Sequence, residues 1–282
     1  MIRFRYLLMH MASMALLSGG ATAEGNPALK RLTLRHDLLG YEAVGKLDLV
    51  GGGYCTGVLI ASDLVLTAAH CLRSAVKAGH VDGLRFRAGL SDGKAIADRT
   101  AKAAVMHPGY DPRRGMSARN IETDVALVQL AQPIPTATAA PFAPSTLPAR
   151  GREVSIVSYA RGRDAALSRQ AVCKVLDRYQ GLLAFNCDVT FGSSGAPIFD
   201  ASGRRPRIVS LVSGGRRTAK GALVYGTELQ ARVAEVKRAL RAGRGVIMST
   251  QRGPGAPPRL IKPGQSGAFG NSGNTGARFV KP

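Results

Sequence analysis

The 282-residue sequence contains no tryptophan, and aromatic residues make up only 5% of it. Proteins that bind single-stranded nucleic acid often stack bases on aromatic side chains, so a specific nucleic-acid partner is not expected. Acidic residues are also scarce, with 18 Asp and Glu against 39 Lys and Arg and a net charge of +21. This excess attracts polyanions, so non-specific binding to anionic surfaces stays open beside the simpler interpretation of a basic, soluble surface.

Cysteine is rare, and none of the four residues forms a CxxC pair or a His/Cys cluster with the spacing of metal ligands. A zinc site is therefore not expected, and nothing in the sequence requires a cofactor. An even number of cysteines outside such motifs favours disulfides in an oxidising compartment. Three pairings are possible. We favour Cys55 with Cys71 and Cys173 with Cys187, each of which would join two neighbouring strands.

Beyond residue 23 the sequence lacks an apolar run long enough to cross a membrane, so no transmembrane anchor is expected there. The first 23 residues have the features of a signal peptide. Arg3 and Arg5 precede a short apolar core, and Ala21-Thr22-Ala23 fits the cleavage rule. The mature protein would then begin at Glu24 and be secreted or periplasmic. An uncleaved N-terminal anchor is the alternative to this interpretation.

Residues 41–245 form one predicted domain. Its short apolar runs, broken by Gly, Asp and Pro, favour antiparallel β structure. A stretch with five prolines, residues 131–151, would connect a first half at 41–130 with a second half at 152–245. Residues 24–40 would be an N-terminal arm or a propeptide.

The hydrophobic period changes near the end of the second half. Leu229, Val233, Val236 and Leu240 recur at helical spacing with charged residues between them, which predicts a C-terminal helix packed on the second half. Residues 246–282 are rich in Gly, Pro and Ser, carry basic side chains and contain no acid, so we expect a disordered basic tail. The tail is too short and too polar to form an appended peptide-binding domain.

Three short motifs carry the residue types of nucleophilic catalysis. Thr67-Ala68-Ala69-His70-Cys71 presents a histidine after an apolar run, Asp124 begins another apolar run, and Ser194 lies in the small-residue turn Gly192–Pro197. A serine hydroxyl needs an adjacent base to become a nucleophile, and histidine suits that role. A buried carboxylate can hold the imidazole in one tautomer. Glycines beside the serine let backbone N–H groups face a developing oxyanion.

The order His70, Asp124, Ser194 within these motifs resembles the chymotrypsin-like serine peptidases, and most closely their compact bacterial secreted branch, which includes glutamyl endopeptidase-like enzymes. The resemblance implies an all-β fold of two antiparallel six-stranded barrels with a C-terminal helix. It implies that His70 is the general base, Asp124 orients it, and Ser194 attacks the peptide carbonyl. The backbone N–H groups of Gly192 and Ser194 would form the oxyanion hole. A monomer that acts on protein or peptide substrates without a cofactor is expected.

Two residues beside the serine depart from the trypsin pattern. Ser193 stands where trypsins have Asp, and Ala196 stands where they have Gly. In trypsins that Asp pairs with the new N-terminus of the activated enzyme, so activation by N-terminal insertion is not expected here. Removal of the arm before Tyr41 would be the simpler route.

The resemblance also suggests which residues bind substrate. Asp188 lies six residues before Ser194, the offset at which trypsins carry the Asp that binds Arg or Lys. Cys187 beside it is not part of the trypsin pattern, so a role for Asp188 as a surface residue stays open. Ser213 and Gly215 match the strand that lines the primary pocket. Glutamyl specificity is not expected, because Val212-Ser213 lacks the histidine that it usually needs on this strand.

We therefore predict a secreted serine endopeptidase that works through a Ser-His-Asp triad and an acyl-enzyme intermediate. The alternative is a catalytically silent protein of the same fold that binds anionic surfaces or polymers, as the charge of the chain would favour. Salt-sensitive binding to polyanions without hydrolysis would support the alternative.

Overall fold

The computed structural model describes residues 29–146, 150–219 and 221–251 of the chain. Two units are distinguished, Met1–Thr250 and Gln251–Pro282, and the strands and helices of the described ranges all lie in the first. The predicted signal peptide lies outside the described residues, as does the predicted tail beyond residue 251. In the described ranges, no helix is long and apolar enough to span a membrane.

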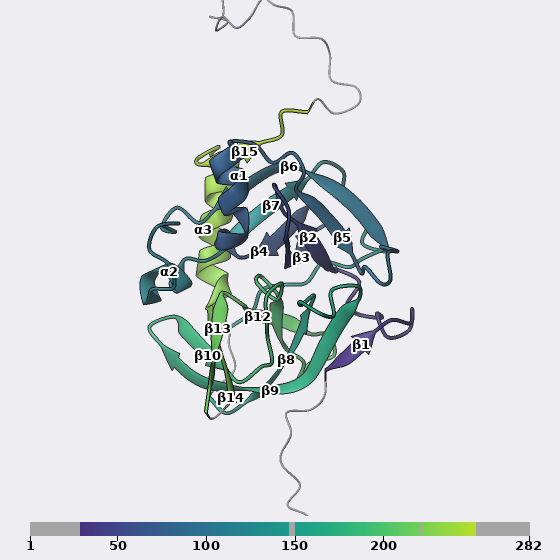
Figure 1. Ribbon diagram of the computed structural model, residues 1–282, viewed down its shortest axis with the longest axis vertical. Helices are drawn as coiled ribbons and strands as arrows, with labels where there is room; N and C mark the ends of the chain where they lie inside the picture. Colours follow the sequence, from purple (N-terminus) through teal and green to yellow (C-terminus); the bar gives the residue numbers. More distant parts are fainter. Residues whose placement is uncertain (1–28, 147–149, 220, 252–282) are drawn as a thin grey trace, which may run out of the picture. The chain divides into compact units, whose positions relative to one another are not determined.

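The first half folds into a closed antiparallel barrel (Figure 1). Its strands follow the order β6-β5-β2-β3-β4-β7, and pairing between β6 and β7 closes the ring. The seventh strand of this sheet, β15, pairs with the second part of β6. Apolar side chains dominate these strands, and β4 is buried along its whole length. The strands span Val44–Asp48 (β2), Tyr54–Ala61 (β3), Leu64–Thr67 (β4), Arg85–Ala88 (β5), Ala97–Met106 (β6), Ala126–Leu130 (β7) and Val246–Met248 (β15).

The second half forms a curled antiparallel sheet. Its order is β12-β11-β8-β9-β10-β14-β13, and β1 pairs with β9 outside this path. No pairing joins the two end strands, β12 and β13, in the described part of the chain, so the sheet curls without closing. The predicted fold class is confirmed, with one closed barrel and one half-barrel. The strands span Lys30–Leu32 (β1), Glu153–Ser158 (β8), Leu167–Tyr179 (β9), Leu182–Phe185 (β10), Pro197–Asp200 (β11), Arg207–Leu211 (β12), Gly214–Thr218 (β13) and Gly221–Thr227 (β14).

The predicted C-terminal helix is present as α3, Leu229–Arg241, and it buries Leu229, Val233, Val236 and Ala239. Its placement differs from the expectation, because α3 packs against β6 and β7 of the first half as well as β12 of the second. Strand β15 follows it, so ordered structure continues past the boundary expected at residue 245. The other helical segments are short: η1 (Ala69–Leu72), α1 (Arg73–Ala78) and α2 (Ala118–Glu122).

The described part of the N-terminal arm is built into the fold. Strand β1 pairs with β9, with Leu32 opposite Leu167. Leu32 is 2% exposed and Leu38 is 4% exposed, and both belong to the hydrophobic core. Cleavage before Tyr41 would therefore remove β1 and two leucines of the hydrophobic core.

Candidate active site

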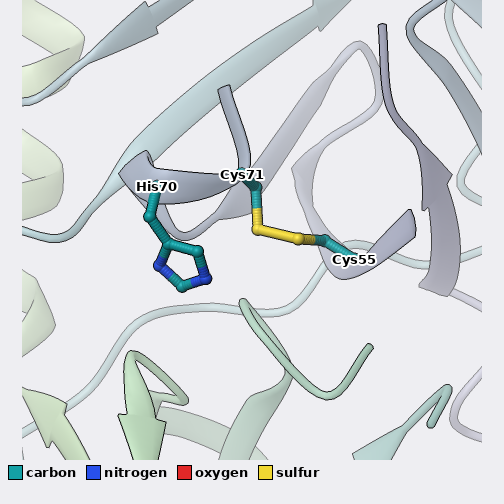
Figure 2. A group of neighbouring side chains, drawn as sticks. All are labelled: Cys55, His70 and Cys71. Atoms are coloured by element: carbon teal, nitrogen blue, oxygen red, sulfur yellow. A yellow bond between two sulfur atoms is a disulfide. The ribbon is translucent and has the colours of Figure 1, made fainter. Parts of the chain in front are cut away.

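Figure 2 shows His70 and Cys71 on the short turn η1, with the disulfide from Cys71 to Cys55 beside the imidazole. The two cysteines lie 16 residues apart in sequence, and Cys55 belongs to strand β3. The bond ties η1 to that strand and so restrains the backbone that carries His70. The second expected disulfide, Cys173–Cys187, joins β9 to the segment after β10. Both expected pairings are present.

The same three side chains are the one group in the described ranges whose possible metal-ligand atoms gather within 4.8 Å: Cys55, His70 and Cys71. A cysteine binds a metal as a free thiolate, and here the two sulfurs are bonded to each other. We therefore interpret the group as a structural disulfide beside an imidazole and assign no metal to it.

Asp124 holds His70 through two hydrogen bonds. Its Oδ2 accepts from the imidazole Nδ1 at 2.7 Å, and its Oδ1 accepts from the backbone N–H of His70 at 2.8 Å. The Asp124 side chain is 5% exposed, whereas that of His70 is 27% exposed and reaches the surface of the cleft. Because the carboxylate accepts at Nδ1, the neutral imidazole carries its proton there and its lone pair on Nε2. This is the tautomer that a general base requires.

The loop before Asp124 forms one wall of the site and is held from within by Asn120 of α2. The Asn120 amide oxygen accepts from the Asp111 N–H at 2.9 Å, and its nitrogen donates to the carbonyls of Asp111 and Gly115 at 2.9 and 2.8 Å. Tyr110 lies on the same loop, where burial and then the nearby charge of Asp124 raise its pKa to about 12. Sequence reasoning missed Asn120 and Tyr110, because no motif marks a side chain whose partners are loop backbone or a distant carboxylate.

Ser194 lies in a turn that both halves of the molecule hold in place. Its carbonyl accepts from the backbone N–H of Thr56 in β3 at 2.8 Å, and the N–H of Gly195 donates to the carbonyl of Val212 at 2.8 Å. Ser194 and His70 line the same cleft. Within the described ranges, Ser194 Oγ and His70 Nε2 have no hydrogen-bond partner. The candidate nucleophile and base therefore share one cleft with their reactive atoms free.

Two glycines allow this turn to form. Gly192 and Gly195 have φ angles of 92° and 75°, in the left-handed region that favours glycine. A Cβ on Gly195 would lie 2.5 Å from the carbonyl oxygen of Thr56, and one on Gly192 would clash with the ring of Tyr54. The first barrel thus approaches the serine turn too closely for any larger residue at either position.

Thr56 connects the first barrel to the serine turn and is fully buried. Its hydroxyl donates to the carbonyl of Gly192 at 2.9 Å and accepts from the backbone N–H of Tyr159 at 3.0 Å. Its own carbonyl accepts from the hydroxyl of Thr67 at 2.9 Å. Sequence reasoning did not identify this role, because Thr56 and Gly192 are 136 positions apart. The only local signal was the position of Thr56 directly after Cys55.

The backbone N–H groups of Gly192 and Ser194 have no acceptor in the described part of the protein. The carbonyl that precedes each of them is occupied. That of Phe191 accepts from the N–H of Arg161 at 2.7 Å, and that of Ser193 accepts within the turn at 2.9 Å. In a trans peptide the C=O and N–H point in opposite directions, so both free N–H groups are directed away from these contacts. Two unpaired donors flanking Ser193 are the arrangement that an oxyanion requires.

Ser193 occupies the position at which trypsins carry Asp, and here it is fully buried. Its hydroxyl lies 3.2 Å from the hydroxyl of Ser158, so the two serines satisfy each other. Such a neutral pair needs no ammonium partner from a new N-terminus. The geometry supports the expectation that N-terminal insertion plays no part in forming the site.

The cleft has a volume of about 490 Å³, within the usual range of ligand pockets. Residues of both halves line it: His70 and Asp124 from the first, and Ser194, Ser213 and Gly215 from the second. The structure therefore brings together the three predicted catalytic residues and two of the three predicted substrate-binding residues.

Among the three predicted substrate-binding residues, Asp188 is the one that does not line the cleft. Its backbone N–H donates to Gln170 Oε1 of β9 at 2.7 Å, and its carboxylate pairs with Arg217 at 3.5 Å. The preceding residue, Cys187, is bonded to Cys173 of the same strand. These contacts place Asp188 beside β9, and its contact with substrate stays a prediction.

The fold is that of a chymotrypsin-like serine peptidase. The family model of the trypsin-like peptidase domain matches residues 55–205, more than half of the chain, and the chain belongs to that family. Trypsin of Sarcophaga bullata is 33% identical over 84 residues, which cover 29% of this chain and only 28% of that protein. A solved structure of a Glu endopeptidase in complex with MPD matches 76% of this chain and 97% of its own, with a TM-score of 0.62 and 18% identity. That similarity shows the fold.

Proposed function

We propose that the protein is a serine endopeptidase in which His70, Asp124 and Ser194 form the catalytic triad. The observation that carries the proposal is the pair of hydrogen bonds from His70 to the buried carboxylate of Asp124, in the cleft that also contains Ser194. Membership of the trypsin-like peptidase family supports peptide bonds as the substrate.

In the proposed reaction, Nε2 of His70 removes the proton of Ser194, whose Oγ attacks the peptide carbonyl carbon. Asp124 keeps the proton of the imidazole on Nδ1 and stabilises the imidazolium that forms. The free N–H groups of Gly192 and Ser194 hold the negative oxygen of the tetrahedral intermediate. His70 then gives its proton to the leaving amine, and water releases the acyl group by the same steps in reverse.

The composition of the cleft supports an uncharged side chain at the position before the scissile bond. Beside Ser213 the walls are apolar and include Val189, Val212 and Leu223. Asp124 is the one carboxylate among the described lining residues, and it is already bonded to His70. A lysine or arginine would therefore enter the pocket without a counter-ion, at a cost in desolvation.

We also propose that the protein is exported and works outside the cytoplasm. Two disulfides formed by all four cysteines fit an oxidising compartment. The sequence features of a cleavable signal peptide at residues 1–23 point the same way.

The proposal is tested by replacing the nucleophile. Protein beginning at Glu24 should hydrolyse an unfolded protein substrate, and Ser194→Ala should abolish hydrolysis while the melting temperature stays close to that of the wild type. Ser193→Ala is the matched control, because it removes a neighbouring hydroxyl that does not enter the cleft and should retain turnover. Full activity in Ser194→Ala would overturn the assignment. A folded wild type that hydrolyses nothing would favour the silent binding protein instead.

A further inference from the structure

Four arginines, which we term the rim arginines, surround the candidate active site. Arg73, Arg216 and Arg217 line the cleft itself. The guanidinium of Arg161 lies 4.3 Å from the centre of the Phe191 ring, and Phe191 also lines the cleft. All four are exposed, and they come from three segments: α1, the loop after β8, and β13, which carries both Arg216 and Arg217.

The positive charge of the rim arginines is almost uncompensated. Arg73, Arg161 and Arg216 form no ion pair in the described part of the chain, and Arg217 has only the 3.5 Å contact with Asp188. Exposed pairs at such distances contribute little and are easily exchanged.

Carboxylates near the cleft are already committed to other partners. Asp124 is bonded to His70, Asp111 contacts two arginines of its own loop, and Glu122 pairs with Arg232 of α3. The cleft therefore presents cations to an approaching substrate without free anions to balance them. A concave site with charge of one sign concentrates ligands of the opposite sign.

The surroundings of the rim arginines favour an extended polypeptide as the anionic ligand. β13 is the end strand of its sheet, and its second edge is not paired with any described strand, although Gly214 and Gly215 line the cleft. An open strand edge offers both N–H donors and C=O acceptors to another peptide chain, whereas a phosphodiester backbone can only accept and leaves the carbonyls unpaired. The apolar walls of the cleft accept a side chain in the same place.

We propose that the cleft selects polypeptides with acidic side chains on either side of the residue that enters the apolar pocket. The inference rests on the proposed function and names its substrate class. The rim arginines contact the flanking carboxylates, while the residue in the pocket is uncharged.

The test compares peptides that share leucine before the scissile bond and carry Glu, Ala or Lys at the flanking positions. The Glu peptide should have the highest kcat/KM and the Lys peptide the lowest. Raising the salt from about 0.01 M to about 1 M shortens the Debye length from about 30 Å to about 3 Å, so the advantage of the Glu peptide should largely vanish. A Lys peptide that is cleaved as well as the Glu peptide at low salt would overturn the proposal.

Arginine variants test whether the preference for the Glu peptide arises in the cleft. Arg73→Ala and Arg216→Ala should each reduce the preference for the Glu peptide about two- to fivefold, as expected for one exposed charge pair. Arg204→Ala is the matched control, because this exposed arginine lies in the turn between β11 and β12, outside the cleft, and its loss changes net charge equally. An equal loss in Arg204→Ala would mean that net charge, not the cleft, sets the preference, and the proposal would fail.

Measuring peptide binding to an inactive variant tests this inference independently of the proposed catalytic function. Fluorescence anisotropy measures the affinity of the Ser194→Ala variant for the labelled Glu and Lys peptides, so the charge preference is obtained without turnover. Tighter binding of the Glu peptide that weakens in Arg73→Ala and Arg216→Ala, but not in Arg204→Ala, supports the inference even if no peptide is hydrolysed. Binding of the Glu peptide that is insensitive to both rim variants, with a DNA duplex bound as tightly, would show a general polyanion surface and overturn the inference.

Discussion

Asp124 accepts two hydrogen bonds from one residue, His70, at its ring nitrogen and at its backbone N–H. One carboxylate oxygen thereby sets the tautomer of the imidazole, and the other fixes the backbone of η1 relative to the segment before β7. The disulfide between Cys55 and Cys71 holds the far side of the same turn. Asp124 thus sets the tautomer of the candidate base and, together with the disulfide, holds its backbone in place.

Asp124→Asn should lower kcat about 10⁴-fold, the loss known for this exchange in a well-studied serine-peptidase triad. The asparagine oxygen can still accept from the backbone N–H of His70. Its NH₂ group would donate to Nδ1, which moves the ring proton to Nε2 and leaves no lone pair to take the serine proton. Kinetics and a melting curve of the variant check this together. Near-normal kcat in a folded Asp124→Asn protein would mean that another group orients His70.

Thr56→Val should impair catalysis through the serine turn, because Thr56 is a positioning residue that does not touch the reacting atoms. The change keeps the shape but leaves the buried carbonyl of Gly192 and the N–H of Tyr159 unpaired, at a cost of about 1–3 kcal/mol each. We expect kcat to fall about tenfold or more, with KM and the pH profile unchanged. Thr56→Ser should restore most of the activity. A loss of stability in Thr56→Val without any loss of kcat would indicate a structural role alone.

Substrates with leucine before the scissile bond should be cleaved at least about tenfold more efficiently than otherwise identical substrates with arginine, a difference of ~1.4 kcal/mol. The apolar walls of the cleft and the absence of a free carboxylate among its described lining residues are the physical reason. Measured kcat/KM for the two peptides decides the matter. If arginine were preferred, and Asp188→Asn removed that preference, Asp188 would have to reach the pocket in the complex.

Part of the stability lost on acidification should come from Asp164, whose Oδ2 accepts a hydrogen bond from Lys46 of β2 at 2.6 Å. That hydrogen bond and the charge of Lys46 lower the pKa of Asp164 below its ordinary value of 3.8. Because the pKa is lower in the folded state, the contribution is present above about pH 4 and is lost as the pH falls through the folded value. Asp164→Asn should therefore melt below the wild type near neutral pH, and the two melting temperatures should converge in acid. A constant difference across the pH series would rule this linkage out.

The candidate catalytic residues could be proposed from sequence because each lies in a short motif with a local physical reason. His70 follows a buried strand beside a disulfide, and the glycines around Ser194 are required by positive φ angles and close contacts. The role of Asp188 could not be decided from its offset to Ser194 alone, because the Cys173–Cys187 disulfide beside it is not part of the trypsin pattern. The positioning role of Thr56 could not be predicted, because its hydrogen-bond partners Gly192 and Tyr159 lie more than 100 residues away in sequence.

The ends of the domain were harder to predict for a related reason. Pairing of β1 with β9, and of β15 with β6, depends on strands far away in sequence. Short segments such as Lys30–Leu32 and Val246–Met248 carry too little periodicity to show this by themselves. The helical period of α3 is visible in the sequence, but the sequence does not show that the helix packs against both halves.

The central claim is that His70 activates Ser194, and a fluorophosphonate probe tests it most directly because such probes react with activated serines. Folded protein beginning at Glu24 would be incubated with the probe, digested, and mapped by mass spectrometry. The account predicts label on Ser194 that disappears in His70→Ala, with both proteins showing the same folded spectrum. Absence of label on the folded wild type, or equal labelling in His70→Ala, would contradict it.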